Sequence, residues 1–88
     1  MTSDDRLIAV GLRKGDRVRF RRNVDEHWKE AEVMRRERDG SLGLRDDKGA
    51  SRAIALELVE VRTVGPRGGV VWERVAERAA RDEQLRLL

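Results

Sequence analysis

Alternation of apolar and charged residues is the feature that most restricts the fold of this chain. Between residues 16 and 22, Val18 and Phe20 would share one face of an extended strand, while Arg17, Arg19 and Arg21 would share the other. A period of two residues is typical of a half-buried β-strand. Similar short segments recur at residues 28–37, 41–46, 51–55 and 58–63. The sequence therefore predicts a mainly β fold with five short strands.

Tight turns separate these segments. Asp39–Gly40 is a dipeptide typical of β-hairpins, and a second glycine-containing turn is expected at residues 46–50. The chain has 88 residues, which make one small domain. Five short strands with too few residues for a sandwich favour a small barrel, and closing the sheet removes its exposed edges. We therefore expect a five-stranded closed barrel at residues 13–64, preceded by an N-terminal segment at 1–12 in which residues 1–6 are disordered.

A glycine-rich stretch at residues 65–69 is expected to end the barrel and act as a hinge. The next segment, 70–83, predicts an α-helix, because Trp72, Val75, Ala76 and Ala79 form one apolar stripe at helical spacing. Such a short helix needs tertiary packing, so Trp72 is expected to pack against the barrel. The stripe ends at about Ala79, and a continued core helix does not explain the leucines at the end of the chain.

The layout of the first part of the chain resembles that of SH3-like barrels of the Tudor and KOW type. The resemblance covers residues 13–63 and rests on a strand with GDRVRF, the tryptophan at position 28, the Asp-Gly turn and a final short strand. It implies a five-stranded SH3-like barrel followed by the C-terminal helix. It is a match of layout, and small barrels of this type serve many functions.

The final five residues, QLRLL, resemble the peptide with which bacterial replication and repair proteins bind the DNA sliding clamp. The resemblance implies that Gln84 is a polar anchor and that Leu85, Leu87 and Leu88 fill hydrophobic pockets. Arg86 would be the unconstrained position. Leu88 stands where phenylalanine is frequent in this peptide, which would weaken the binding. Anchor residues on a short peptide are a common mode of recognition by a groove.

Two alternative roles for these leucines stay open. They would fold back onto a groove of the barrel, or they would join two copies of the chain. The oligomeric state is therefore left open by the sequence.

Arginines on the charged face of the first strand predict a basic strip. Its members would be Arg17, Arg19, Arg21 and Arg22, joined by Arg35 and Arg36 and by Arg45 or Arg52. A strip of this kind suits the phosphate backbone of DNA, with weak, salt-dependent binding that is not sequence-specific. The alternative is that glutamates on the neighbouring strand, such as Glu30 and Glu32, neutralise the arginines.

Trp28 is predicted to border a protein-binding groove of the barrel. With three aromatic residues in the chain and no tyrosine, a cage for methylated side chains is not expected.

Catalytic and metal chemistry find little support in the sequence. The chain has no cysteine and a single histidine, His27, which is expected to lie in a surface loop. We expect no enzyme activity, metal or cofactor. The chain contains no apolar run of the length needed to span a membrane, and a cytoplasmic location near the nucleoid is expected.

These observations favour a non-enzymatic accessory protein of DNA replication or repair that binds the sliding clamp through residues 84–88. Its barrel would contact DNA or another protein. The alternative is a Tudor-like protein-interaction module, for example one that binds RNA polymerase or serves transcription or translation, with the tail packed on its own fold.

Overall fold

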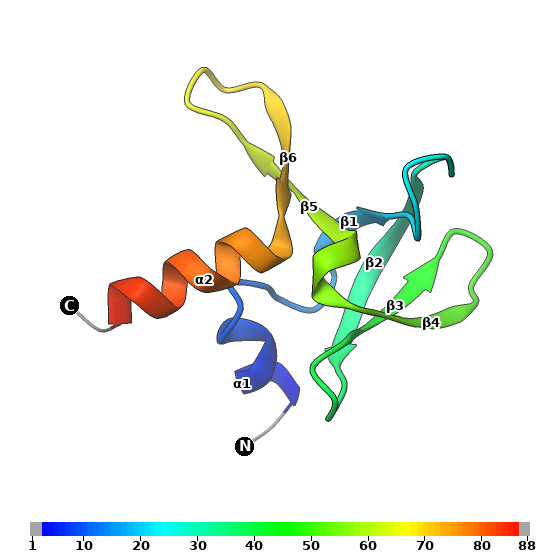
Figure 1. Cartoon of the computed structure of the whole chain (residues 1–88), viewed down its shortest axis with the longest axis horizontal. Helices are drawn as coiled ribbons and strands as arrows, with labels where there is room; N and C mark the ends of the chain where they lie inside the picture. The colour runs from blue at the N-terminus through cyan, green and yellow to red at the C-terminus, as the bar shows by residue number, and fades with distance from the viewer. Residues whose placement is uncertain (1–2, 87–88) are drawn as a thin grey trace.

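A single six-stranded antiparallel sheet with two α-helices makes up the computed structural model, which describes residues 3–86 and the side chains of residues 5–85. The strand order is β4-β3-β2-β1-β5-β6 (Figure 1). The elements in chain order are α1 (Ser3–Ile8), β1 (Arg17–Phe20), β2 (Lys29–Arg36), β3 (Leu42–Asp46), β4 (Ser51–Ile54), a 3₁₀ turn (Leu56–Leu58), β5 (Val59–Val64), β6 (Val70–Arg74) and α2 (Val75–Arg86).

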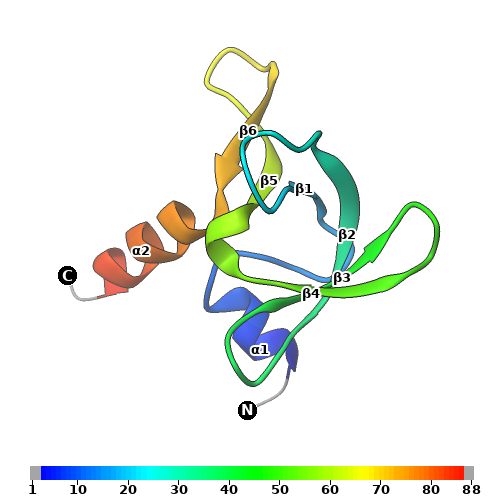
Figure 2. The same ribbon diagram turned by 45° about the vertical axis from the view of Figure 1, so that its right-hand side comes forward.

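The predicted alternation is confirmed in the strands. Val18 and Phe20 of β1 are buried, and they pair across the sheet with the segments around Ala31 of β2 and Val61 of β5. Other apolar residues at alternate strand positions join them in one core, namely Val33, Leu42, Leu44, Ile54 and Val59. The strands curve around this core (Figure 2). The mainly β class and the C-terminal helix are thus observed.

The prediction of a five-stranded closed barrel is wrong. The sheet has six strands, and within residues 3–86 its outer strands β4 and β6 each pair with one neighbour only. The sixth strand arises from residues 65–69, which were expected to act as a hinge. They form a tight turn that returns the chain onto β5, so Val70 pairs with Val64 and the sheet gains a sixth strand.

Three hairpins in the sheet are closed by the same kind of turn. The turns span residues 37–41, 46–50 and 65–69. In each turn, the N–H of the first residue donates to the carbonyl of the fifth, and the carbonyl of the first residue accepts from the N–H of the fourth. The fourth residue is Gly40, Gly49 or Gly68, with φ between 83° and 92°. A three-residue loop ending in a left-handed residue is a standard hairpin connection, and glycine adopts that conformation without steric cost.

The helix predicted at residues 70–83 begins five residues later than expected. Val70, Val71 and Trp72 belong to β6, and α2 starts at Val75. β-Branched and aromatic residues favour strands, and this preference prevails once the preceding turn places the segment beside β5. Trp72 accordingly packs as a strand residue and not as part of a helix. α2 instead docks through Val75, which is fully buried, and Ala79.

The N-terminal segment is also more ordered than predicted. Residues 1–6 were expected to be disordered, but α1 begins at Ser3. The reason is the apolar residues that follow: Leu7, Val10 and Leu12 are all buried in the core. Gly11, between them, lies against α2, since a Cβ atom there would be 2.6 Å from an oxygen of Asp82. α1 and α2 are thus both held to the sheet.

Candidate functional site

Arginine and tryptophan side chains stack on the outer face of β1. The guanidinium carbon of Arg19 lies 4.2 Å from the centroid of the Trp28 ring and 4.7 Å from that of Trp72. The guanidinium carbon of Arg21 lies 4.2 Å from the Trp28 ring. Attraction between a cation and the face of an aromatic ring holds such stacks together.

Glu60 of β5 fixes the central arginine of this stack. The Nε and Nη2 atoms of Arg19 donate to Oε1 of Glu60 at 2.8 and 2.6 Å. Both side chains are mostly shielded from solvent, with 26% of Arg19 and 16% of Glu60 exposed. The charge of Arg19 is balanced by this carboxylate, so Arg19 adds little net positive charge to the surface.

Strand pairing explains how residues from distant parts of the chain meet here. Arg19 pairs with Glu60 in the register of β1 and β5, and Arg62 of β5 pairs with Trp72 of β6. Residues opposite each other on antiparallel strands project on the same face. Trp28 immediately precedes β2 and reaches the same face. We call Arg19, Arg21, Trp28, Arg62 and Trp72 the arginine–tryptophan surface.

Carboxylates accompany several of the arginines predicted to bind nucleic acid. Arg17 lies 3.3 Å from Asp47 and 3.9 Å from Glu30. Arg19 is held by Glu60, as described above, and Arg45 lies 4.0 Å from Glu32. Binding of nucleic acid by this strip stays a prediction, but these three arginines lie beside carboxylates that offset their positive charge.

Arg22, Arg35 and Arg36 do not form one row with the arginines of β1. Arg22 follows β1 in the loop before β2, where its backbone N–H donates to Glu26. Arg35 and Arg36 lie at the other end of β2, beside the turn to β3. Arg35 pairs with Glu37 at 2.7 Å, and the Arg36 side chain donates to the Gly40 carbonyl at 3.3 Å.

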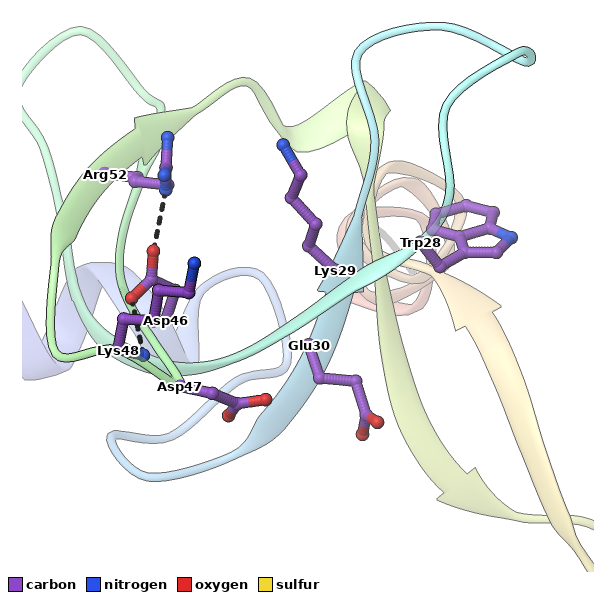
Figure 3. A pocket seen from close by; sticks show the side chains of 7 residues that line it. All are labelled: Trp28, Lys29, Glu30, Asp46, Asp47, Lys48 and Arg52. Atoms are coloured by element: carbon purple, nitrogen blue, oxygen red, sulfur yellow. Dashed lines mark hydrogen bonds and ion pairs between the residues drawn. The ribbon is translucent and has the colours of Figure 1, made fainter.

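A pocket of about 450 Å³ lies beside Trp28 (Figure 3). It is lined by Trp28, Lys29, Glu30, Asp46, Asp47, Lys48 and Arg52. Asp46 organises one end of the pocket, where it accepts hydrogen bonds from the Arg52 side chain at 3.0 Å and from the N–H groups of Ala50 and Lys48 at 2.9 Å. Chiefly the hydrogen bond from Arg52, and then those from the backbone, lower the pKa of Asp46. The pocket lies where a groove near Trp28 was expected, and protein binding in it stays a prediction.

A second hollow of about 310 Å³ also borders the stack. Trp28 lines it together with Arg21, Arg22 and Arg74, and with the acidic residues Glu57 and Glu60. Trp28 thus contributes to two depressions, one around Asp46 and one beside Arg74 of β6.

The predicted clamp-binding residues fall at the end of α2. Gln84 and Leu85 lie in its last turn and are exposed, Leu85 to 60%. Leu87 and Leu88 lie outside the described residues. Among the apolar residues of α2 whose side chains the structure describes, Ala79 is the last that packs against the core. The exposure of Gln84 and Leu85 therefore leaves both side chains accessible to a partner.

Glu60, Arg62 and Trp72 were not predicted from the sequence to lie together on one face of the sheet. The available signal was the alternation in β5, where buried Val59 and Val61 place Glu60 and Arg62 on the opposite side. Trp72 required recognition of β6, and its signal was the glycine at the fourth position of the turn, shared with the two earlier hairpins.

No helix in the described part of the chain is long and apolar enough to cross a membrane. Comparisons of the chain with models of protein families, with curated proteins and with solved structures found no match.

Proposed function

We propose that this chain is a non-enzymatic accessory protein of bacterial DNA replication or repair. In this proposal, Gln84, Leu85, Leu87 and Leu88 bind the sliding clamp, and the sheet presents a surface to a second macromolecule. The observation that carries the proposal is the QLRLL motif, whose first two residues are exposed beyond the packed part of α2. A leucine that contributed to the core would be buried, as Leu7 and Leu12 are.

The second macromolecule in the proposal is a protein rather than DNA. Arg17 and Arg19 both lie beside carboxylates, and DNA would have to displace these or accept their repulsion. Tryptophan and arginine, by contrast, are the residues that dominate binding energy at protein interfaces. Trp28, flanked by Arg19 and Arg21, has this character.

The finer fold class of the proposal is an SH3-like sheet extended by one strand. In support of it, β1 to β4 form a meander, a 3₁₀ turn follows, and β5 returns to pair with β1. This is the layout that the resemblance of residues 13–63 implies. β6 and α2 would be additions that carry the motif away from the sheet.

The expected affinity for the clamp is modest. Burial of a leucine side chain contributes roughly 1.5–3 kcal/mol, and ordering of the peptide offsets part of this gain. A motif with two or three buried leucines would therefore bind with a dissociation constant on the order of micromolar.

The test is a titration of a bacterial sliding clamp with the full chain and with a variant that ends at Glu83, together with thermal melting of both. We expect binding to disappear with the last five residues while the melting temperature is unchanged. As matched single substitutions, Leu87→Ala should weaken binding at least about tenfold, whereas Arg86→Ala, at the unconstrained position, should change it less than about threefold.

The opposite result would contradict the proposal. If the full chain does not bind and the truncated form melts at a lower temperature, the leucines belong to the fold. The chain would then be a protein-interaction module of the RNA polymerase-binding kind, working through the sheet alone.

A further inference from the structure

β6 is an outer strand of the sheet, and alternate residues of it direct their backbone groups away from β5. The N–H of Gly65 donates to the carbonyl of Gly69 at 2.8 Å, which fixes the phase of the pairing. In an antiparallel pair, hydrogen-bonded and non-hydrogen-bonded positions alternate. Val71 and Glu73 therefore bond to β5, whereas the N–H groups of Val70, Trp72 and Arg74 point toward the open edge.

Apolar side chains gather on the hairpin that ends in this edge. Val64 is 70% exposed, Val70 55% and Val71 43%. The hairpin of β5 and β6 projects away from the rest of the sheet (Figure 1), and its three valines are accessible to solvent. An exposed strand edge with apolar side chains is a template for pairing with another strand.

The charges around this edge are positive. Arg62 and Arg67 take part in no ion pair within the described residues, and Arg74 has only a distant partner, Glu77 at 4.0 Å. The hairpin's two carboxylates are already engaged. Glu60 is held by Arg19, and Glu73 lies 3.5 and 3.0 Å from two arginines of α2. Pairing of β6 with a second copy would bring like charges together, which disfavours it.

We propose that the open edge of β6 binds an extended acidic segment of a partner protein by strand addition. The edge offers alternating N–H donors and C=O acceptors, which match a peptide backbone; a nucleic-acid phosphate would use the donors alone. Acidic side chains of the added strand would face Arg74 and Arg67, and apolar ones would contact Val70 and Trp72. An acidic segment of this kind would belong to the protein partner in the proposed function, and its binding to β6 does not depend on clamp binding.

The test uses amide hydrogen exchange and ¹⁵N chemical shifts of the full chain. The probe is an eight-residue peptide with four central valines and two glutamates at each end, used at concentrations where the peptide is monomeric. In the free protein, the N–H groups of Val70 and Trp72 should exchange fast, and those of Val71 and Glu73 slowly. Saturating peptide should slow exchange at Val70 and Trp72 at least about tenfold. A lysine–valine peptide of equal length should have no effect.

Two substitutions at one position separate backbone pairing from side-chain contact. Val70→Pro removes an N–H that makes no bond to β5, and proline is tolerated at such edge positions. It should weaken peptide binding about tenfold, because a carbonyl of the added strand loses its donor. Val70→Thr keeps the N–H and should bind within about threefold of the parent. Should the proline variant fail to fold, Arg74→Glu tests the charge requirement by favouring the lysine–valine peptide over the glutamate–valine one.

Several outcomes would overturn this inference. Slow exchange of Val70 and Trp72 in the free protein would show that the edge is already covered, and protection that grows with protein concentration would show self-pairing. Equal binding of both peptides, or shifts confined to residues away from β6, would also refute it. Val70→Pro should bind the sliding clamp as the parent does, so failure of strand addition and failure of the clamp proposal are distinguishable.

Discussion

The Arg19→Met substitution tests whether the arginine–tryptophan stack stabilises the fold. Methionine keeps an unbranched apolar stem but removes the charge that Glu60 binds. A hydrogen bond to a charged group contributes about 1.5–3 kcal/mol, and each cation–π contact adds about 0.5–1 kcal/mol. Arg19 contacts two rings and one carboxylate, and its side chain is 26% exposed. Allowing for non-additivity and this partial exposure, we expect a loss of about 3 kcal/mol of unfolding free energy.

The assay is urea denaturation followed by intrinsic fluorescence. Trp28 and Trp72 are the only tryptophans and the chain has no tyrosine, so the signal reports on the stack itself. Arg45→Met is the matched control, because Arg45 lies 4.0 Å from Glu32 and the two side chains are 53% and 37% exposed. That control should change stability by less than about 0.5 kcal/mol.

A double-mutant cycle with Glu60→Gln identifies the origin of the effect. Arg19→Met alone leaves the Glu60 carboxylate, which is 16% exposed, without its partner. Adding Glu60→Gln removes this uncompensated charge, so the double variant should be about 1 kcal/mol more stable than Arg19→Met. The reasoning is refuted if Arg19→Met lies within about 0.5 kcal/mol of the parent, or if the two substitutions are simply additive.

Three further results are expected from other parts of the sheet. Gly40→Ala, at a φ of 92°, should lose about 1–2 kcal/mol in urea denaturation, because alanine is strained in the left-handed region, and an unchanged midpoint would contradict this. The folded-state pKa of Asp46 is lowered, so the stability that this carboxylate contributes is present above the ordinary aspartate pKa of about 3.9 and is lost as the pH falls through the lower folded value. Asp46→Asn should therefore make the melting temperature depend less on pH across this acidic range. Glu73→Gln should speed amide exchange in α2 with the sheet unaffected, since Glu73 pairs with two arginines of that helix; uniform acceleration across the chain would indicate global destabilisation instead.

The parts of the fold that alternation specifies could be predicted from the sequence. Val18, Phe20, Ala31 and Val33 are buried as expected, because a period of two fixes which face meets the core. The pattern fails at residues 70–74, where apolar side chains also satisfy a helical stripe. The turn at residues 65–69 decides between strand and helix, because it returns the chain beside β5. From the sequence alone, the glycines of this stretch were equally consistent with a hinge and with a hairpin turn.

The candidate site was less accessible to prediction than the strands. Arg19 and Arg21 were correctly placed on an outer face, but the sequence could not reveal that Trp72 lies beside Arg19, since the two are brought together through β5. Charge patterning suggested a basic strip, whereas cross-strand register supplies acidic partners such as Glu60. Which residues face each other depends on how distant strands pair, and the charges along one strand do not predict this pairing. Clamp binding by residues 84–88 stays a prediction.

The central place of β1 in the sheet has a consequence for the speed of folding. β1 pairs with β2, which follows it closely in the chain, and with β5, where Arg19 meets a residue 41 positions later. The β2–β3, β3–β4 and β5–β6 hairpins close over three-residue loops, so they can form early. Pairing of β5 with β1, in contrast, requires the closure of a long loop. We expect substitutions in the Arg19–Glu60 pair to accelerate unfolding while leaving the refolding rate nearly unchanged. The last step of folding would then be the one that assembles the arginine–tryptophan surface.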